Sequence, residues 1–493
     1  MSVIEPRQDV AVVRQETARA SNAAALMDRD PVEIGRALIY AALVAVLLER
    51  MLAIASDLHL WGDGTWFLLR IASTRDYYFW VGDWRSGLFR SRIFTLLAEQ
   101  TPLVLATHLR IHSLHILSLI YGTTLYSHAL LSLYICYRYA AKRWYMLFPL
   151  LSLFAGSMNA EGYICTDSHF LVSLYWPVLF ILLFQEELKK GTLLLLLALS
   201  IPTVLSYESM MFFGIILAGV CLWRWKTFSH SRTVVAGLAA WYLLGAALAL
   251  AAFIWPFDPA NKSGFVHGLL WIPQSDHLAA KTSILVLSCC AVLLATPSRL
   301  AKLWLFPSGI GLAAILYLWV EVLSGRAPVG LDVLVPARIL NLVTPLAATA
   351  LLFAVLFGWF KPDRKAIGLT AILVGALGLG QALWTFGCMT EWQGMLATLR
   401  YELLLHEGPV AYEDSVMSRD RLGPLHLSRL HANWPLPLLS IYESGQGEVR
   451  SIVSPSVGAY LPVDPLNPST LPDLSRYRVY YDSYRAALDR NKR

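Results

Sequence analysis

Long apolar runs recur along the chain, and they constrain its fold more than any other feature of the sequence. Each run holds roughly 20 residues, the length that an α-helix needs to cross the hydrocarbon of a bilayer. The runs are continuous rather than alternating, which excludes a transmembrane β-barrel. Of the 493 residues, 56% are hydrophobic and only 15% are charged. We therefore expect an all-α polytopic membrane protein.

We predict about eleven transmembrane helices, at roughly 20 residues per crossing. Their expected positions are 37–56, 111–136, 144–160, 168–185, 191–206, 209–224, 233–255, 281–297, 302–323, 336–359 and 366–387. The fifth and sixth are short and could form one broken or re-entrant unit. A polar arm of residues 1–36 precedes the first span. That span is long enough to be retained as a signal-anchor, with the arm in the cytoplasm.

The basic residues predict the orientation of the chain in the membrane. Lys and Arg occur in five alternate turns, at 138–143, 185–190, 224–232, 298–302 and 361–365. The facing turns are poor in basic residues, as the positive-inside rule expects for a cytoplasmic N-terminus. The first outer loop, residues 57–110, is rich in arginine, but long loops are weak topology signals. We expect a multi-pass protein of the cell (inner) membrane whose C-terminal region is extracytoplasmic.

The first outer loop carries two further helical patterns. Thr65–Ser73 and Leu88–Ala98 show helical periodicity with one apolar face. Both are shorter than a membrane span, so we expect amphipathic helices that lie at the membrane interface. Helices of this kind can shape the entrance for a substrate that is carried on a lipid.

Ionisable side chains gather on the predicted outer face, in short segments next to span ends. Acids near the bilayer are costly, so they are candidates for a functional site. The candidates are Asp57, His59 and Asp63 in the first loop, Glu161 and Asp167 in the second, Glu208 in the third, and Arg326 and Arg338 between spans nine and ten. Chemistry at the outer surface is the natural inference.

The composition changes after residue 388. Residues 389–493 are polar and Pro-rich, and they contain no predicted span. We expect a small extracytoplasmic α+β domain there. It would contain a helix at Trp392–His406, strands at Leu438–Tyr442 and Val449–Val453, and a Pro-rich tail at Tyr460–Pro472. The predicted organisation is thus an arm (1–36), a transmembrane domain (37–388) and this C-terminal domain (389–493).

The chain resembles the GT-C superfamily of polytopic membrane glycosyltransferases, in particular bacterial members of the protein-mannosyltransferase-like and GtrII-like type. The resemblance lies in the long outer loop directly after the first span, which opens with Asp57 and carries Asp63 in the sequence WGDG. The predicted spans, amphipathic helices and outer C-terminal domain are similar too. A single-spaced Asp-X-Asp is absent, and His59 stands where some members carry an acid. This departure leaves open which acid is the base and whether a divalent cation takes part.

The resemblance implies the reaction. Members of the superfamily take a sugar from a polyprenyl-phosphate or polyprenyl-diphosphate carrier on the extracytoplasmic side of the membrane. They transfer it to a lipid, glycan or protein acceptor, usually with inversion. The expected partners are therefore the lipid-linked donor, the acceptor and membrane lipids. Nucleic acid is not expected, because the sequence has no basic stripe with interleaved aromatics.

Inverting transfer needs a base for the acceptor hydroxyl and a cation for the departing phosphate. A partly buried carboxylate suits the first role, and we assign it to Asp57, with Asp63 as the second candidate. Alternatively, Asp57 caps a turn or pairs with an arginine, and Asp63 is a turn residue between two glycines. The phosphate would be held by Arg326 or Arg338, with Arg90 and Arg92 as further candidates. Arginines of this kind can instead snorkel to the interface.

The remaining candidates are open between function and structure. Glu161, Asp167 and Glu208 would line a substrate cavity, or would cap and pair helices. The histidines at 108, 112 and 115 would share one helix face and could bind a metal with Asp57 or His59. Histidines at a membrane interface more often serve as hydrogen-bonding groups, so no metal site is assigned.

Two other classes of function remain open. A transporter or flippase of a lipid-linked or small solute would typically show internal repeats and ionisable residues near the middle of spans. We find no repeat, and the candidate acids lie at span ends on one side. A polymerase or ligase of surface polysaccharide would use the same lipid-linked substrate with outer arginines in place of an aspartate base. A chain that has lost activity and serves as a scaffold is also compatible with the sequence.

Overall fold

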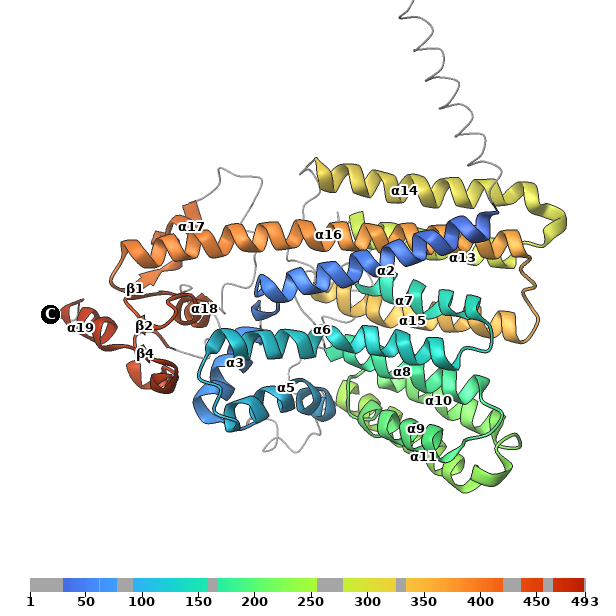
Figure 1. Cartoon of the computed structure of the whole chain (residues 1–493), viewed down its shortest axis with the longest axis horizontal. Helices are drawn as coiled ribbons and strands as arrows, with labels where there is room; N and C mark the ends of the chain where they lie inside the picture. The colour runs from blue at the N-terminus through green and yellow to red at the C-terminus, as the bar shows by residue number, and fades with distance from the viewer. Residues whose placement is uncertain are drawn as a thin grey trace, which may run out of the picture.

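The computed structural model describes residues 30–61, 63–77, 92–157, 167–254, 278–324, 334–419, 436–454 and 464–491. Most of them lie in long helices that run roughly side by side (Figure 1). The helices before the C-terminal region are α2 (Pro31–Ala55), α3 (Asp63–Thr74), α5 (Ile93–His108), α6 (Leu114–Tyr139), α7 (Leu147–Ser157), α8 (Asp167–Phe184), α9 (Lys190–Thr203), α10 (Met210–Arg224), α11 (Arg232–Ile254), α13 (Leu278–Ala295), α14 (Leu305–Leu323), α15 (Leu334–Leu356) and α16 (Arg364–Leu405).

The chain is a membrane-embedded helical protein. Seven helices among the described residues are long and apolar enough to cross a bilayer: Pro31–Ala55, Leu114–Tyr139, Arg232–Ile254, Leu278–Ala295, Ser298–Leu323, Ile339–Leu356 and Arg364–Leu405. Shorter apolar helices cover Ser168–Phe184, Lys190–Thr203 and Met210–Arg224. A helix therefore occupies each of the predicted span positions, whereas the number of about eleven crossings stays a prediction.

Helix α16 differs most from the sequence prediction. The last predicted span and the predicted helix Trp392–His406 are one continuous helix of 42 residues, about 63 Å long. Residues 388–391 between them are Cys, Met, Thr and Glu, none of which interrupts a helix as Pro would. The predicted boundary at residue 388 therefore lies inside a helix, although the composition changes there.

Helices α2 and α16 pack closely and run parallel. Their first turns are joined by the ion pair of Asp30 and Arg364 at 2.5 Å, and at the other end the Trp392 Nε1–H donates to the Ser56 carbonyl at 2.8 Å. Glycines permit the approach, as in other membrane helix pairs: a Cβ on Gly375 would lie 2.7 Å from the Leu38 Cβ. Because the two helices run parallel, the residues that follow each one lie at the same end of the pair.

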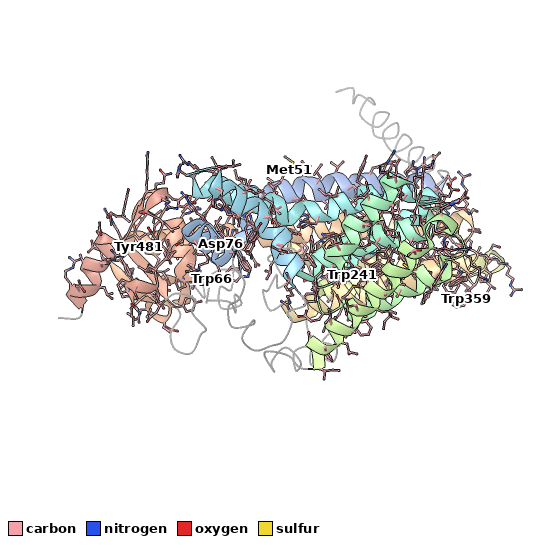
Figure 2. All side chains as sticks on the ribbon, turned by 90° about the horizontal axis from the view of Figure 1, so that it is seen from below. Met51, Trp66, Asp76, Trp241, Trp359 and Tyr481 are labelled. Carbon is pink, nitrogen blue, oxygen red and sulfur yellow. The ribbon has the colours of Figure 1, made fainter. Side chains whose placement is uncertain are left out.

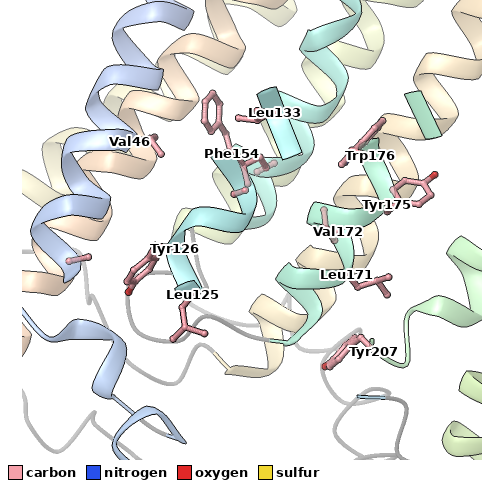
Figure 3. Packing of buried hydrophobic residues seen from close by; sticks show 14 of the residues in the cluster. Val46, Leu125, Tyr126, Leu133, Phe154, Leu171, Val172, Tyr175, Trp176 and Tyr207 are labelled. Carbon is pink, nitrogen blue, oxygen red and sulfur yellow. The ribbon is translucent and has the colours of Figure 1, made fainter. Parts of the chain in front are cut away.

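Buried side chains from several helices form the core of the bundle. Figure 3 shows Val46 of α2, Phe154 of α7 and Trp176 of α8 among the residues of this apolar cluster. One polar pair in this core lies between α7 and α8. The Trp176 indole N–H donates to the Ser152 hydroxyl at 3.1 Å, because an unpaired donor in this environment would be costly.

The C-terminal region is built around the far end of α16. Strand β1 (Gly408–Ala411) pairs in parallel with β3 (Ser451–Ser454), and β2 (Gly447–Glu448) pairs in parallel with β4 (Val479–Tyr480). The helices are α17 (Val416–Arg419), α18 (Leu436–Glu443) and α19 (Asp482–Asn491). Figure 2 shows this region, marked by Tyr481, beside Trp66 and Asp76 of the first loop. A contact between the two is the hydrogen bond from the Asp473 backbone N–H to the Ser73 hydroxyl at 3.1 Å.

The two predicted strands of this region have different outcomes. Val449–Val453 overlaps β3, so a strand is confirmed there. The predicted strand at Leu438–Tyr442 is wrong, because these residues belong to helix α18. A short apolar run is ambiguous between the two structures, and here residues 436–441 are buried on all sides between α3, α16 and β3. The described part of the predicted Pro-rich tail, residues 464–472, contains a short 3₁₀ turn at Pro468–Thr470.

The described part of the predicted first outer loop is more enclosed than the sequence predicted. A helix at Thr65–Ser73 is confirmed as α3, but it does not present one exposed face at an interface. All of Gly64–Ala72 except Arg70 is buried, because α3 packs against α5, α6 and α18. The second predicted helix, Leu88–Ala98, corresponds to α5, which begins only at Ile93. Residues 88–91 lie outside the described residues.

The close pairing of α2 and α16 predicts an effect of one added methyl group. Gly375→Ala should lower the free energy of unfolding by about 1–3 kcal/mol, because the new Cβ would overlap Leu38 across the interface. The matched control is Gly219→Ala in α10, where a Cβ would meet nothing within 4 Å. The control should be neutral or slightly stabilising, since Ala favours helix over Gly. Thermal unfolding of both variants in detergent is the measurement, and equal stability would contradict the proposed packing constraint.

Candidate functional site

Asp57 lies where the chain leaves helix α2 and turns into a short 3₁₀ helix at Leu58–Leu60. Its backbone is left-handed, with φ of 57°, a conformation that Asp and Asn tolerate better than most residues. The preceding carbonyl, that of Ser56, accepts hydrogen bonds from the Trp392 indole and the Gln393 amide, each at 2.8 Å. The turn that carries Asp57 is therefore held in place by helix α16.

The Asp57 carboxylate accepts hydrogen bonds from two hydroxyl groups that come from distant parts of the chain. The Ser118 hydroxyl of α6 donates to Oδ1 at 2.5 Å, and the Tyr442 hydroxyl of α18 donates to Oδ2 at 3.1 Å. Each carboxylate oxygen is thus held by a different helix. The site combines the first loop, the start of α6 and the C-terminal region.

His59 contacts Ser118, one of the two residues that hold the Asp57 carboxylate. Its Nε2 lies 2.8 Å from the Ser118 Oγ. Because the single Ser118 hydroxyl proton goes to Asp57, the His59 Nε2 must carry the proton and donate, which leaves Nδ1 bare. The Nδ1 atom has no hydrogen-bond partner among the described residues. It faces Gly122, and a Cβ added to that glycine would lie 2.7 Å from Nδ1. The imidazole is 3% exposed, so it orients Ser118 rather than contacting a ligand.

An ion pair lies next to Asp57 on the other side. The Arg400 Nε of α16 is 2.5 Å from the Glu443 Oε2 of α18. The Glu443 side chain is 4% exposed, whereas Arg400 is half exposed. Glu443 follows Tyr442 directly, so the pair also fixes the end of α18 that reaches Asp57.

Burial decides the protonation of these groups. It raises the pKa of Asp57, and the hydrogen bonds from Ser118 and Tyr442 oppose that rise. Burial also raises the pKa of Glu443. Arg400 lowers this pKa, whereas the nearby Asp57 charge raises it further. The same desolvation lowers the pKa of His59 to about 3, so its imidazole is neutral. The result is a carboxylate of increased basicity beside a neutral histidine.

The structure also pairs two other candidates with each other. Arg92 precedes α5, and its guanidinium makes two hydrogen bonds to the Glu208 carboxylate, at 3.0 and 3.2 Å. Arg92 also lies over the Tyr207 ring, 4.8 Å from its centroid. Of the two roles that the sequence left open for Glu208, cavity lining and helix pairing, the structure shows a helix-pairing contact. This contact joins the start of α5 to the turn between α9 and α10.

Several predicted site residues have no described side chain. Asp63 is the first residue of α3, Asp167 is the first residue of α8, and Arg338 lies in the first turns of α15. Their side chains are outside the description. Arg90, Glu161 and Arg326 lie entirely outside the described residues. Their roles stay predictions.

The predicted face of three histidines does not form. His108 ends α5, whereas His115 belongs to α6, which begins at Leu114. The chain turns at Arg110, with φ of 61°, so the spacing of four and three residues is not helical spacing here. Within the part of the chain that the structure describes, no group of three His, Cys, Asp or Glu side chains could hold a metal ion.

Sequence reasoning missed the partners of Asp57. Ser118 and Tyr442 lie 61 and 385 residues away along the chain, and no local pattern marks either of them. Tyr442 was placed at the end of a predicted strand, which would not have fixed its direction. Only the path of α16 and α18 brings it to Asp57.

A second polar cluster within the spans was also missed. Glu49 and Arg50 of α2 are both buried, with 3.7 Å between the Arg50 Nε and a Glu49 carboxylate oxygen. The Arg50 guanidinium lies 5.0 Å from the centroid of the Tyr126 ring, and buried His169 of α8 is close enough to feel its charge. A signal was available, because two charged residues inside the first apolar run mark a functional candidate.

Comparison with protein-family models, with curated proteins and with solved structures finds no match for this chain.

The buried neutral His59 predicts a loss of stability in acid. Below its ordinary pKa of 6.5 the unfolded chain binds a proton that the folded chain binds only near pH 3. The free energy of unfolding should therefore fall as the pH drops through this window, by up to about 1.4 kcal/mol per pH unit for one proton. His59→Gln should remove this contribution, and His108→Gln, at an exposed site, should not. Thermal unfolding between pH 7 and about pH 4 measures it, and equal slopes for wild type and His59→Gln would refute it.

Proposed function

We propose that the chain is a membrane glycosyltransferase in which Asp57 is the general base. It would move a sugar from a polyprenyl-phosphate-type donor to a lipid, glycan or protein acceptor at the outer face of the cell membrane. The observation that carries the proposal is the Asp57 carboxylate itself. It lies directly beyond a candidate span, is partly buried, and is held by hydroxyl groups on both oxygens.

The geometry of Asp57 suits removal of a proton from a hydroxyl group. A carboxylate oxygen has two lone pairs, so each oxygen can accept a second hydroxyl donor beside Ser118 or Tyr442. Burial raises the pKa of Asp57 towards the range where a base works best at neutral pH. His59 is unsuited to the same role, because its pKa is lowered to about 3 and its ring is enclosed.

The parallel packing of α2 and α16 supports the arrangement of the proposed enzyme. Asp57 follows α2, and the C-terminal region follows α16, so both lie on one side of the membrane. With the N-terminus in the cytoplasm, as the basic turns predict, this side is the extracytoplasmic one. A lipid-linked sugar and its acceptor would meet there.

A cation must stabilise the departing phosphate. Arg92 is engaged by Glu208, so it serves this role only if substrate displaces that pair. Arg326 and Arg338 remain our candidates, because Arg326 precedes α15 in the chain and Arg338 lies in its first turns. Arg400 is a further cation close to Asp57, since its charge reaches that carboxylate.

One observation favours a second candidate function, a flippase or transporter. Buried Glu49 and Arg50 lie inside a candidate span, and buried His169 lies in the shorter apolar helix α8. Transport pathways often contain ionisable groups of this kind. The two functions differ in product, because a transporter moves the lipid-linked sugar without breaking the glycosidic bond.

The test is turnover of lipid-linked sugars by the purified protein in nanodiscs. A panel of polyprenyl-phosphate and polyprenyl-diphosphate hexoses is supplied with membrane-extracted acceptors, and release of the free carrier lipid is followed by mass spectrometry. Asp57→Asn should lower the rate at least about 100-fold, as expected for loss of a general base, with binding of the donor lipid retained.

The control is Asp76→Asn, in the same predicted loop. The Asp76 side chain is exposed and accepts a hydrogen bond from the Tyr77 backbone N–H, so its removal should leave the rate within about twofold. Full activity of Asp57→Asn would refute the base assignment. Movement of a fluorescent lipid-linked sugar across liposomes, without release of carrier lipid from any donor, would instead establish transport.

A further inference from the structure

Tyr442 is where the C-terminal region reaches the reaction centre proposed above. It lies in the last turn of α18, and its hydroxyl donates to the Asp57 Oδ2 at 3.1 Å. Asp57 and Tyr442 are 385 residues apart in the chain. No other element of the C-terminal region contributes a described hydrogen bond to this carboxylate.

Helix α18 is built to hold Tyr442 in a fixed place. Ser440, two residues earlier, donates to the Leu436 carbonyl at 2.7 Å and accepts from the Val453 backbone N–H at 3.1 Å. Residues 436–441 are buried. Glu443, the next residue, is joined to Arg400 of α16.

Helix α16 holds the other end of the same contact. Trp392 and Gln393 both donate to the Ser56 carbonyl, directly before Asp57. Arg400 lies about two turns further along α16 and anchors α18. One continuous helix, α16, therefore contacts both the turn that carries Asp57 and the helix that carries Tyr442. The distance between Asp57 and Tyr442 is thus set by helix packing and not by a loop.

We propose that Tyr442 is a positioning residue: with Ser118 it fixes the orientation of the Asp57 carboxylate and stabilises its ionised form for proton removal. The C-terminal region is then an integral part of the reaction centre and not a separate binding module. This role rests on the proposed function of Asp57 as general base.

The physical reason is the freedom of a carboxylate with only one donor. A hydrogen bond to Oδ1 alone leaves the group able to rotate and Oδ2 able to take another partner. Donors on both oxygens, one from α6 and one from α18, restrict it to one orientation. A phenol that donates to a carboxylate also favours the anion over the acid.

Other ionisable groups face Asp57 and must be separated from this effect. They are His59 of the 3₁₀ helix, His115 of α6, Arg400 of α16 and Glu443 of α18. Tyr442→Phe leaves each of them in place, because it removes one oxygen atom and keeps the ring. A change in the titration of Asp57 in this variant is therefore due to the lost hydroxyl group.

The first measurement needs no substrate. Infrared difference spectra between acidic and neutral pH, on the protein in nanodiscs, show the carboxyl band of protonated Asp57, which is assigned by its loss in Asp57→Asn. In Tyr442→Phe this band should titrate at higher pH than in the wild type. The matched control is Tyr484→Phe in α19, whose hydroxyl donates to the Pro465 carbonyl at 2.7 Å and is remote from Asp57. The control should titrate like the wild type.

The second measurement is the pH profile of turnover on the donor that the assay above identifies. In Tyr442→Phe, kcat should fall about tenfold, the size expected for one hydrogen bond to a charged group. The acidic limb of the profile should move to higher pH, while the KM for the donor changes less than about twofold. A merely structural role would lower the amount of folded enzyme without moving the limb.

The outcomes separate this inference from the proposed function. An unchanged infrared titration together with an unchanged acidic limb in Tyr442→Phe overturns the role of Tyr442, even if Asp57→Asn abolishes turnover. A shifted infrared titration in Tyr442→Phe, with no turnover of any donor by the wild type, supports the Tyr442–Asp57 contact and overturns glycosyl transfer instead.

Discussion

The close parallel packing of α2 against α16 is the constraint on which the rest of this structure depends. Glycines such as Gly375 let the two backbones approach, and the Asp30–Arg364 ion pair fixes their relative start. Since α16 continues for 42 residues without a break, this register is carried beyond the end of α2. It decides which part of the C-terminal region stands opposite Asp57.

The candidate site shows how a membrane protein can hold a carboxylate in a defined state. Burial makes Asp57 more basic, while hydroxyl donors from α6 and α18 keep the anion accessible and oriented. The neutral His59 contributes only through Ser118. Burial and hydrogen bonding thus shift the pKa of Asp57 in opposite directions, and burial has the larger effect. Shifted pKa values are common where a side chain must exchange a proton.

The remaining polar groups divide into two kinds. The Arg92–Glu208 pair connects α5 to the turn before α10 and behaves as a structural joint. The Glu49–Arg50 pair lies inside α2, where burial of charge calls for a functional reason. This second cluster lies in the helix that leads directly to the turn that carries Asp57.

The sequence by itself determined the membrane class and the positions of the apolar helices, because hydrophobic length is a local property. The cost of charge near a bilayer also made the residues after the first span candidates for a site. The sequence also singled out Asp57. It did not predict the continuity of α16, the helix at Leu436–Glu443, or the enclosure of α3. Tertiary structure alone decided that Ser118 and Tyr442 share the Asp57 carboxylate, since hydrogen bonds between residues 61 and 385 positions apart depend on packing that no local pattern encodes.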